Sequence, residues 1–198
     1  MPHQLGFFAP PDGGRTVVLS DDDMGTITYT PAVFSPEESA RLFEVLYGQI
    51  EWQAERRWMY DREVDVPRLH ASFTERPFPP VLDEMRARVE PRIGVTIDRI
   101  GLNLYRDERD SVAWHNDRIA ELGERPAIAL VSLGATRRML LRTKPAAPQK
   151  RSLSIDLEPG SLLVMRGSSQ LFWDHAVPKE RRRLGPRISV VMRRPGMA

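Results

Sequence analysis

The sequence predicts a single α+β domain in which an N-terminal part with helices supports a C-terminal barrel of two β-sheets. The clear helix signals lie in residues 1–97, whereas short β-branched and aromatic runs, separated by turn residues, fill residues 98–198. Many short strands with regular turns are typical of a sandwich or a barrel. A chain of 198 residues with 41% hydrophobic residues is large enough for one hydrophobic core.

The composition narrows the class of protein. Cysteine is absent, which excludes disulfides, thiolate metal sites and a cysteine nucleophile. No apolar run approaches the roughly 20 residues that span a bilayer, and no signal peptide is visible, so we expect a cytoplasmic protein without a membrane partner. The net charge is only +2. Arginine and lysine residues occur in clusters, which we interpret as a solvated surface. The alternative interpretation is that these side chains contact the phosphates of a nucleic acid.

Two strands and two helices are expected in the N-terminal part. The first helix has the clearest start in the sequence, because Ser35 is a good N-cap and Glu38 completes a capping box. Apolar residues then recur at helical spacing until Gly48, a plausible stop. A second helix is predicted from Pro80 to about Glu90. The strands are expected at Val17–Leu19 and Thr26–Thr30.

The C-terminal part is expected to consist mainly of short strands. Turn signals such as Glu158-Pro159-Gly160 separate the apolar runs. The predicted strands are Ile100–Tyr105, Ala127–Leu133, Met139–Leu141, Leu153–Leu157, Ser161–Met165 and Ile188–Met192.

Three residues of this part form a candidate metal site. His115 and Asp117 lie two positions apart in the sequence W-H-N-D, so their side chains point to the same side of an extended segment. His175 follows in F-W-D-H-A, far enough along the chain to lie on a facing strand. Two imidazoles and one carboxylate can hold a ferrous ion on one face and leave other positions open. A single H-x-D triplet is a weak signal by itself.

Two arginines follow the last of these residues. Arg187 and Arg193 are separated by an even number of positions, so they share one face of a predicted strand. If this face points into the barrel, both charges need an anionic ligand, and an organic acid with carboxylates would supply it. The alternative is an edge strand whose arginines face outward.

Several motifs in order resemble the AlkB family of iron(II)- and 2-oxoglutarate-dependent dioxygenases. They are N-L-Y-R-D-E-R-D-S-V-A-W-H-N-D, V-S-L-G-A-T-R-R, P-G-S-L-L-V-M-R-G-S-S-Q-L-F-W-D-H-A-V-P-K and G-P-R-I-S-V-V-M-R. The similarity covers about Asp98 to Arg194, and a weaker match, M-Y-D-R-E-V-D-V-P-R, extends it upstream. The resemblance implies a double-stranded β-helix, a jelly-roll or cupin-like barrel, in residues 98–198, with a nucleotide-recognition region in residues 1–97.

The resemblance also implies roles for individual residues. His115, Asp117 and His175 would be the iron ligands and the catalytic centre. Arg187 would bind the distal carboxylate of 2-oxoglutarate, with Arg193 near its chelating carboxylate. The other implied contacts are Asn103 and Tyr105 with the co-substrate, and Tyr60, Arg68 and Phe73 with the substrate. Ser189 stands where the family motif has asparagine, so we expect weaker but intact co-substrate binding.

The implied reaction is oxidative demethylation of alkylated nucleobases in DNA or RNA, which uses Fe(II), 2-oxoglutarate and O2. Because the base must reach a buried iron, the nucleic acid would be single-stranded or the base flipped. We expect a monomer. The segments that follow Asp117 and Arg68 differ from those of the repair members, so the metal chemistry is better supported than the substrate.

Three alternatives stay open. The same chemistry could act on a protein side chain or a small metabolite. The barrel could be a binding module without catalysis, although the intact ligand triplet argues against this. A zinc hydrolase would leave an inward pair of arginines without a role.

Overall fold

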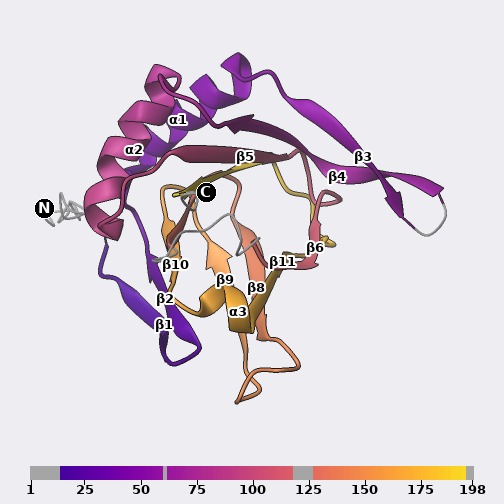
Figure 1. Ribbon diagram of the computed structural model, residues 1–198. Helices are drawn as coiled ribbons and strands as arrows, with labels where there is room; N and C mark the ends of the chain where they lie inside the picture. Colours follow the sequence, from indigo (N-terminus) through magenta and orange to yellow (C-terminus); the bar gives the residue numbers. More distant parts are fainter. Residues whose placement is uncertain (1–13, 60–61, 118–126, 195–198) are drawn as a thin grey trace, which may run out of the picture.

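The computed structural model describes residues 14–59, 62–117 and 127–194. In this part of the chain two antiparallel sheets form the body of the molecule, and helices cover one of them (Figure 1). The larger sheet has the strand order β1-β2-β10-β7-β12-β5-β4-β3, and the smaller has the order β6-β11-β8-β9. The elements are β1 Val17–Asp22, β2 Gly25–Thr30, α1 Pro36–Gln49, β3 Gln53–Met59, β4 Arg62–Phe73, α2 Pro80–Ile93, β5 Arg99–Tyr105, β6 Val112–His115, β7 Ala127–Gly134, β8 Arg137–Thr143, β9 Ser152–Leu157, β10 Leu162–Arg166, α3 Ser169–Phe172, β11 Trp173–Val177 and β12 Arg187–Arg193.

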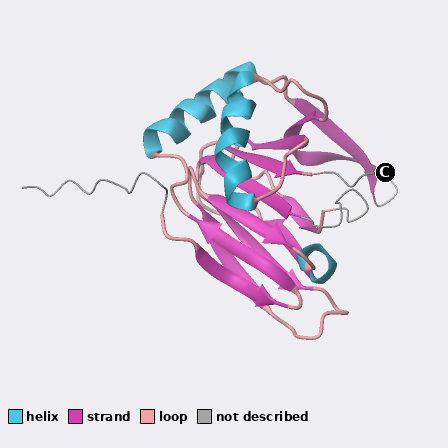
Figure 2. Cartoon of the chain, turned by 60° about the vertical axis from the view of Figure 1, so that its left-hand side comes forward, coloured by secondary structure: helices cyan, strands magenta, loops and turns pink. Residues whose placement is uncertain are grey.

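The hydrophobic core has two parts, one on each face of the larger sheet. Leu42, Leu46 and Leu82 of the helices pack with Ile188 and Val190 of β12 on one face. The second part lies between the two sheets and includes Leu141, Leu163 and Trp173 among its buried side chains. Figure 2 shows α1 and α2 on the same side of the strands. The space between the sheets is therefore the inside of the barrel.

Helix α1 begins where the sequence predicts it. The Ser35 hydroxyl accepts a hydrogen bond from the Glu38 backbone N–H at 3.2 Å, and the Glu38 carboxylate accepts one from the Ser35 N–H at 2.8 Å. This capping box satisfies two backbone donors at the helix start. Helix α2 continues to Ile93, past the predicted end, and stops at Gly94, whose φ of 64° suits glycine.

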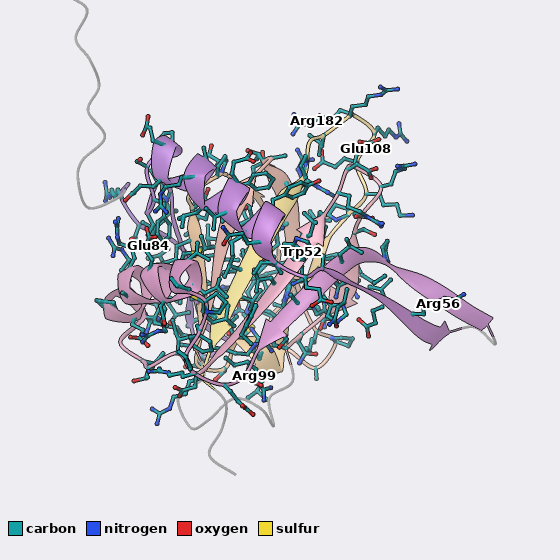
Figure 3. The ribbon with its side chains drawn as sticks, turned by 90° about the horizontal axis from the view of Figure 1, so that it is seen from above. Trp52, Arg56, Glu84, Arg99, Glu108 and Arg182 are labelled. Carbon is teal, nitrogen blue, oxygen red and sulfur yellow. The ribbon has the colours of Figure 1, made fainter. Side chains whose placement is uncertain are left out.

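The N-terminal part contributes strands as well as helices. β2 pairs with β10, and β4 pairs with β5, so residues on both sides of position 97 share the larger sheet. The long β3–β4 hairpin, which the sequence did not predict, projects from the body (Figure 1), and Arg56 lies on this projecting part (Figure 3). No helix in the described ranges has the length and apolarity that crossing a membrane requires.

The strand registers bring the candidate residues together. On β12, Arg187 lies opposite Tyr105 and Ser189 lies opposite Asn103 of β5. In the smaller sheet His175 of β11 pairs with a residue of β6, and that partner is His115. Residues far apart in the sequence therefore meet as direct cross-strand neighbours.

Candidate functional site

The two histidines lie side by side on paired strands of the smaller sheet. The ring centroids of His115 and His175 are 4.3 Å apart, and the rings are tilted by 54°. Nε2 of His175 lies 3.9 Å from Oδ2 of Asp117. Strand β6 carries His115, the segment after β6 carries Asp117, and β11 carries His175. The three predicted residues therefore lie close together.

Both imidazoles are suited to bind a metal ion. Nδ1 of His115 lies 2.8 Å from the carbonyl oxygen of Ala113, which can only accept, so Nδ1 carries the proton and Nε2 keeps a free electron pair in the neutral ring. Burial lowers the pKa of His175 to about 4, helped by the neighbouring His115 and opposed by Asp117. His175 is therefore neutral at neutral pH, which is the form that binds metals.

The carboxylate of Asp117 is held by Arg193. Nη1 of Arg193 lies 3.2 Å from Oδ1 of Asp117, and the Asp117 backbone N–H donates to Oε1 of buried Gln170 at 2.9 Å. In the described ranges no group of three His, Asp or Glu side chains is close enough to share one ion as it stands. Ligand atoms bound side by side at about 2.1 Å from a metal lie about 3 Å apart. The donor chemistry fits iron, and Oδ2 of Asp117, the oxygen that does not pair with Arg193, would have to lie closer to Nε2 of His175 than 3.9 Å for both atoms to bind one ion.

A cavity of about 200 Å³ opens beside these residues. It receives polar side chains from strands of both sheets, and methionine and aliphatic side chains fill the rest of its wall. Arg68 reaches into it from β4 and donates from Nε to Oδ1 of Asn103 at 2.8 Å. The polar and charged lining residues are Arg68, Asn103, Tyr105, His115, Asp117, His175, Ser189 and Arg193.

Arg187 supplies a buried positive charge to the same region. Its side chain is completely buried, its Nε donates to the Ser132 hydroxyl at 2.8 Å, and its guanidinium carbon lies 5.2 Å from the centroid of the Tyr105 ring. Nη1 and Nη2 have no hydrogen-bond partner in the described structure. Burial lowers the pKa of Arg187 to about 10, so the group stays charged at neutral pH. A buried guanidinium with two unused donors is suited to a carboxylate ligand.

The three residues that were expected to contact the substrate do not all lie at this cavity. Arg68 lines the cavity. Phe73 packs against the helix-side core and lies near Pro79 and Val81, so the structure does not bring it to this cavity. Tyr60 lies outside the described residues.

Sequence reasoning missed three residues that shape the site. Gln170 holds the backbone of Asp117 and Ser132 holds Arg187. Both lie inside motifs that carry the family resemblance, but no role was assigned to either residue. Arg137 belongs to a basic cluster that was expected on a solvated surface, but its side chain is completely buried. The clue was strand parity, because Arg137 lies two and four positions before Met139 and Leu141 and so shares their buried face of β8.

Comparisons with known proteins agree with this geometry. Residues 26–193 match the model of the 2OG-Fe(II) oxygenase superfamily. The chain therefore belongs to this superfamily of oxygenases, which use Fe(II), 2-oxoglutarate and O2. It is 31% identical over 201 residues to the human alpha-ketoglutarate-dependent dioxygenase alkB homolog 3, a match that covers 92% of this chain and 70% of the relative. Within the superfamily the chain is thus an AlkB-like member, as the sequence motifs predicted.

A second relative and two solved structures extend the comparison. Bovine DNA oxidative demethylase ALKBH2 is 28% identical over 184 residues, which cover 82% of this chain and 66% of the relative. The structure of OsALKBH1 has a TM-score of 0.60 at 11% identity, covering 90% of this chain and all of that chain. The non-heme alpha-ketoglutarate-dependent epimerase SnoN has a TM-score of 0.62 at 15% identity, covering 86% and 77%. These structures confirm the predicted double-stranded β-helix.

Proposed function

We propose that this oxygenase removes alkyl groups oxidatively from nucleobases in DNA or RNA. The observation that carries the proposal is the pairing of a His115–His175–Asp117 cluster with a buried, unpaired Arg187 in one region of the barrel. The names of the relatives, which include DNA oxidative demethylases, support a nucleic-acid substrate. Residues 1–198 are proposed to form one domain that acts as a monomer. Residues 1–97 would support the barrel and recognise the nucleotide.

The proposed ligands for iron are His115, His175 and Asp117, and the bound iron would supply the activation of oxygen and the oxidation of the alkyl carbon. The protein's own part is to hold and orient the ion and the co-substrate. The two imidazoles would supply electron pairs, and Asp117 would supply a carboxylate oxygen while Arg193 holds the other oxygen. Arg187 would bind the distal carboxylate of 2-oxoglutarate through its two unpartnered NH2 groups.

The remaining cavity residues are proposed to complete the co-substrate site. Asn103, Tyr105 and Ser189 line the cavity from β5 and β12 and offer hydrogen-bond donors. The guanidinium of Arg193 lines the same cavity, and its Nε, which has no partner in the described structure, would meet the carboxylate at the other end of the co-substrate. A five-carbon diacid would thus be held at both ends.

The position of the cavity limits the form of nucleic acid that can act as a substrate. The cavity is lined by strands of both sheets and lies inside the barrel, so a base inside a duplex cannot reach it without leaving the stack. We infer that the base enters flipped or from a single strand. Arg68 of β4 is proposed to contact the substrate at the cavity, together with Tyr60. The position of Phe73 favours a packing role instead.

The test is turnover with defined oligonucleotides. The protein is loaded anaerobically with Fe(II) and 2-oxoglutarate, then given O2 and a panel of methylated DNA and RNA strands, with unmodified strands as the reference. We expect formaldehyde together with loss of the methylated base. Arg187→Met should need far more 2-oxoglutarate, whereas Arg138→Met, an exposed arginine, serves as the matched control.

The outcome also separates the alternatives. His175→Ala should abolish both formaldehyde and succinate. Succinate that forms without any change in the bases would reject the nucleic-acid substrate and favour a protein side chain or a metabolite. Absence of succinate from the folded, iron-loaded protein with every substrate would reject the proposed site itself.

A further inference from the structure

Arg137 is a buried cation that the proposed reaction does not use. It begins strand β8, and its side chain is completely buried. Its guanidinium donates to the carbonyl oxygens of Asp107 at 3.0 Å, Asp110 at 2.8 Å and Pro178 at 2.8 Å. These acceptors are uncharged. The largest opposing charge is that of Glu180, whose carboxylate lies 3.6 Å from Nε, and Asp110 and Asp107 contribute less.

These bonds join two loops at one end of the barrel. Asp107 and Asp110 follow β5, and Pro178 follows β11. The same loops also meet directly, because the Glu180 N–H donates to the Glu108 carbonyl at 2.9 Å. Figure 3 shows Glu108 and Arg182 close together at this end of the molecule. Arg137 therefore fixes the end of β5 relative to the smaller sheet.

The last residue of β5 is Tyr105, and its ring contacts two guanidinium groups. The guanidinium carbon of Arg137 lies 5.4 Å from the ring centroid, and that of Arg187 lies 5.2 Å from it. Arg187 is also the direct cross-strand partner of Tyr105. Each contact is of the cation–π type, which strengthens when the groups are desolvated. Tyr105 thus couples the loop cross-link to the anion-binding guanidinium.

We propose that Arg137 is a positioning residue that sets the distance between the distal-carboxylate site of Arg187 and the metal site. It holds Tyr105 at the end of β5, and Tyr105 in turn packs against the guanidinium of Arg187. Arg137 does not touch the co-substrate. Its loss lets Tyr105 and Arg187 shift, so the site discriminates less between dicarboxylic acids of different length. This inference rests on the proposed role of Arg187.

The experiment measures binding and needs no turnover. The protein is loaded with Mn²⁺ in place of iron, and calorimetry gives the affinities for 2-oxoglutarate and for 2-oxoadipate, which is one methylene longer. We expect the native protein to prefer 2-oxoglutarate. In Arg137→Met the affinity for 2-oxoglutarate should fall at least about tenfold, whereas the affinity for 2-oxoadipate should fall much less. The ratio of the two affinities, which measures the preference for 2-oxoglutarate, should therefore decrease.

Two further variants keep the test decisive. Arg137→Lys keeps the charge but cannot reach three carbonyls with one planar group, so its preference should also narrow, to a smaller extent. It replaces Arg137→Met if the latter does not fold. Arg138→Met, the next residue on β8, carries an exposed side chain that pairs with Asp156 and should leave both affinities unchanged.

The outcomes separate this inference from the function on which it rests. If Arg187→Met does not weaken 2-oxoglutarate binding, the proposed co-substrate site fails. If Arg187→Met weakens it and the folded Arg137 variants keep the native preference, only the positioning role fails. An equal loss of both acids in the Arg137 variants also overturns the positioning role, because general loosening would weaken both alike.

Discussion

Asp117 and Arg193 form an ion pair inside the barrel, with 3.2 Å between Oδ1 and Nη1, and both side chains are largely shielded from solvent. The other oxygen of this carboxylate, Oδ2, lies 3.9 Å from Nε2 of His175, so Asp117 can face the proposed metal site and Arg193 at the same time. A metal ion bound there would stand beside a guanidinium whose Nε has no partner in the described structure. Because an anionic co-substrate would offset both positive charges, this relationship predicts that the metal and the co-substrate bind cooperatively.

Arg193→Met is expected to strengthen the binding of Co²⁺ in the absence of 2-oxoglutarate. The substitution removes a positive charge that lies beside the proposed site and repels the ion, which is worth on the order of 1 kcal/mol, or several-fold in affinity. Optical titration with Co²⁺ measures the effect. Arg194→Met, at the exposed neighbouring position, is the control. Weaker Co²⁺ binding in Arg193→Met would contradict this repulsion.

Arg187→Met is expected to maintain or raise the stability of the ligand-free protein while it destroys co-substrate binding. The guanidinium is completely buried and two of its nitrogens lack partners, so an apolar side chain of similar size removes a desolvation cost. Because a buried charge without an ionic partner is costly, we expect the replacement to be neutral or stabilising. Denaturant unfolding without 2-oxoglutarate gives the free energy of unfolding. A clear loss of stability would show that Arg187 has a structural role.

Arg106→Met is expected to destabilise the protein at neutral pH but not in acid. Burial raises the pKa of Asp110, but hydrogen bonds from the Arg106 side chain and backbone outweigh it, so the pKa lies below the usual 3.8. A carboxyl group with a lowered pKa stabilises the fold above its unfolded pKa, and this contribution disappears as the pH falls through the folded pKa.

We expect a loss of about 1 kcal/mol near pH 7, reduced by the exposure of Arg106 to solvent. The free energies of unfolding of the native protein and the variant should converge below about pH 3.8. Parallel pH profiles for the two proteins would contradict the linkage to Asp110.

Ser35→Ala is expected to lower the free energy of unfolding by about 1 kcal/mol, because it removes the acceptor for the Glu38 N–H at the start of α1. Ser168 offers a matched control. It occupies the N-cap of α3, but its side chain makes no capping hydrogen bond, so Ser168→Ala should change the stability little. Equal losses in the two variants would argue that the capping hydrogen bond contributes nothing.

The local part of the fold could be predicted well from the sequence. The start of α1 depends on a cap formed by residues three positions apart, and β12 shows a continuous buried run from Ile188 to Val191. Both signals are complete within a few residues. Side-chain parity predicted that His115 and Asp117 point to the same side, whereas the meeting of His115 with His175 depends on the pairing of β6 with β11, which the sequence does not fix.

The β3–β4 hairpin could not be predicted in the same way. Strand β3 reads Q-A-E-R-R-W-M, which has no regular apolar face, and β4 contains Pro67 within its length. These strands exist because β4 pairs with β5, a contact between distant parts of the chain. The burial of Arg137 was hidden for a related reason, since its acceptors are backbone carbonyls that the sequence does not distinguish.

The order of strands in the larger sheet has a consequence for any attempt to shorten the protein. β1 and β2 flank β10 on one side, and β4 and β3 flank β5 on the other, so these four N-terminal strands cover both margins formed by the C-terminal strands of the larger sheet. A fragment that starts at residue 98 would bare the hydrogen-bonding groups of β10 and β5 together. Such margins recruit further strands, so the fragment should self-associate rather than behave as a minimal enzyme.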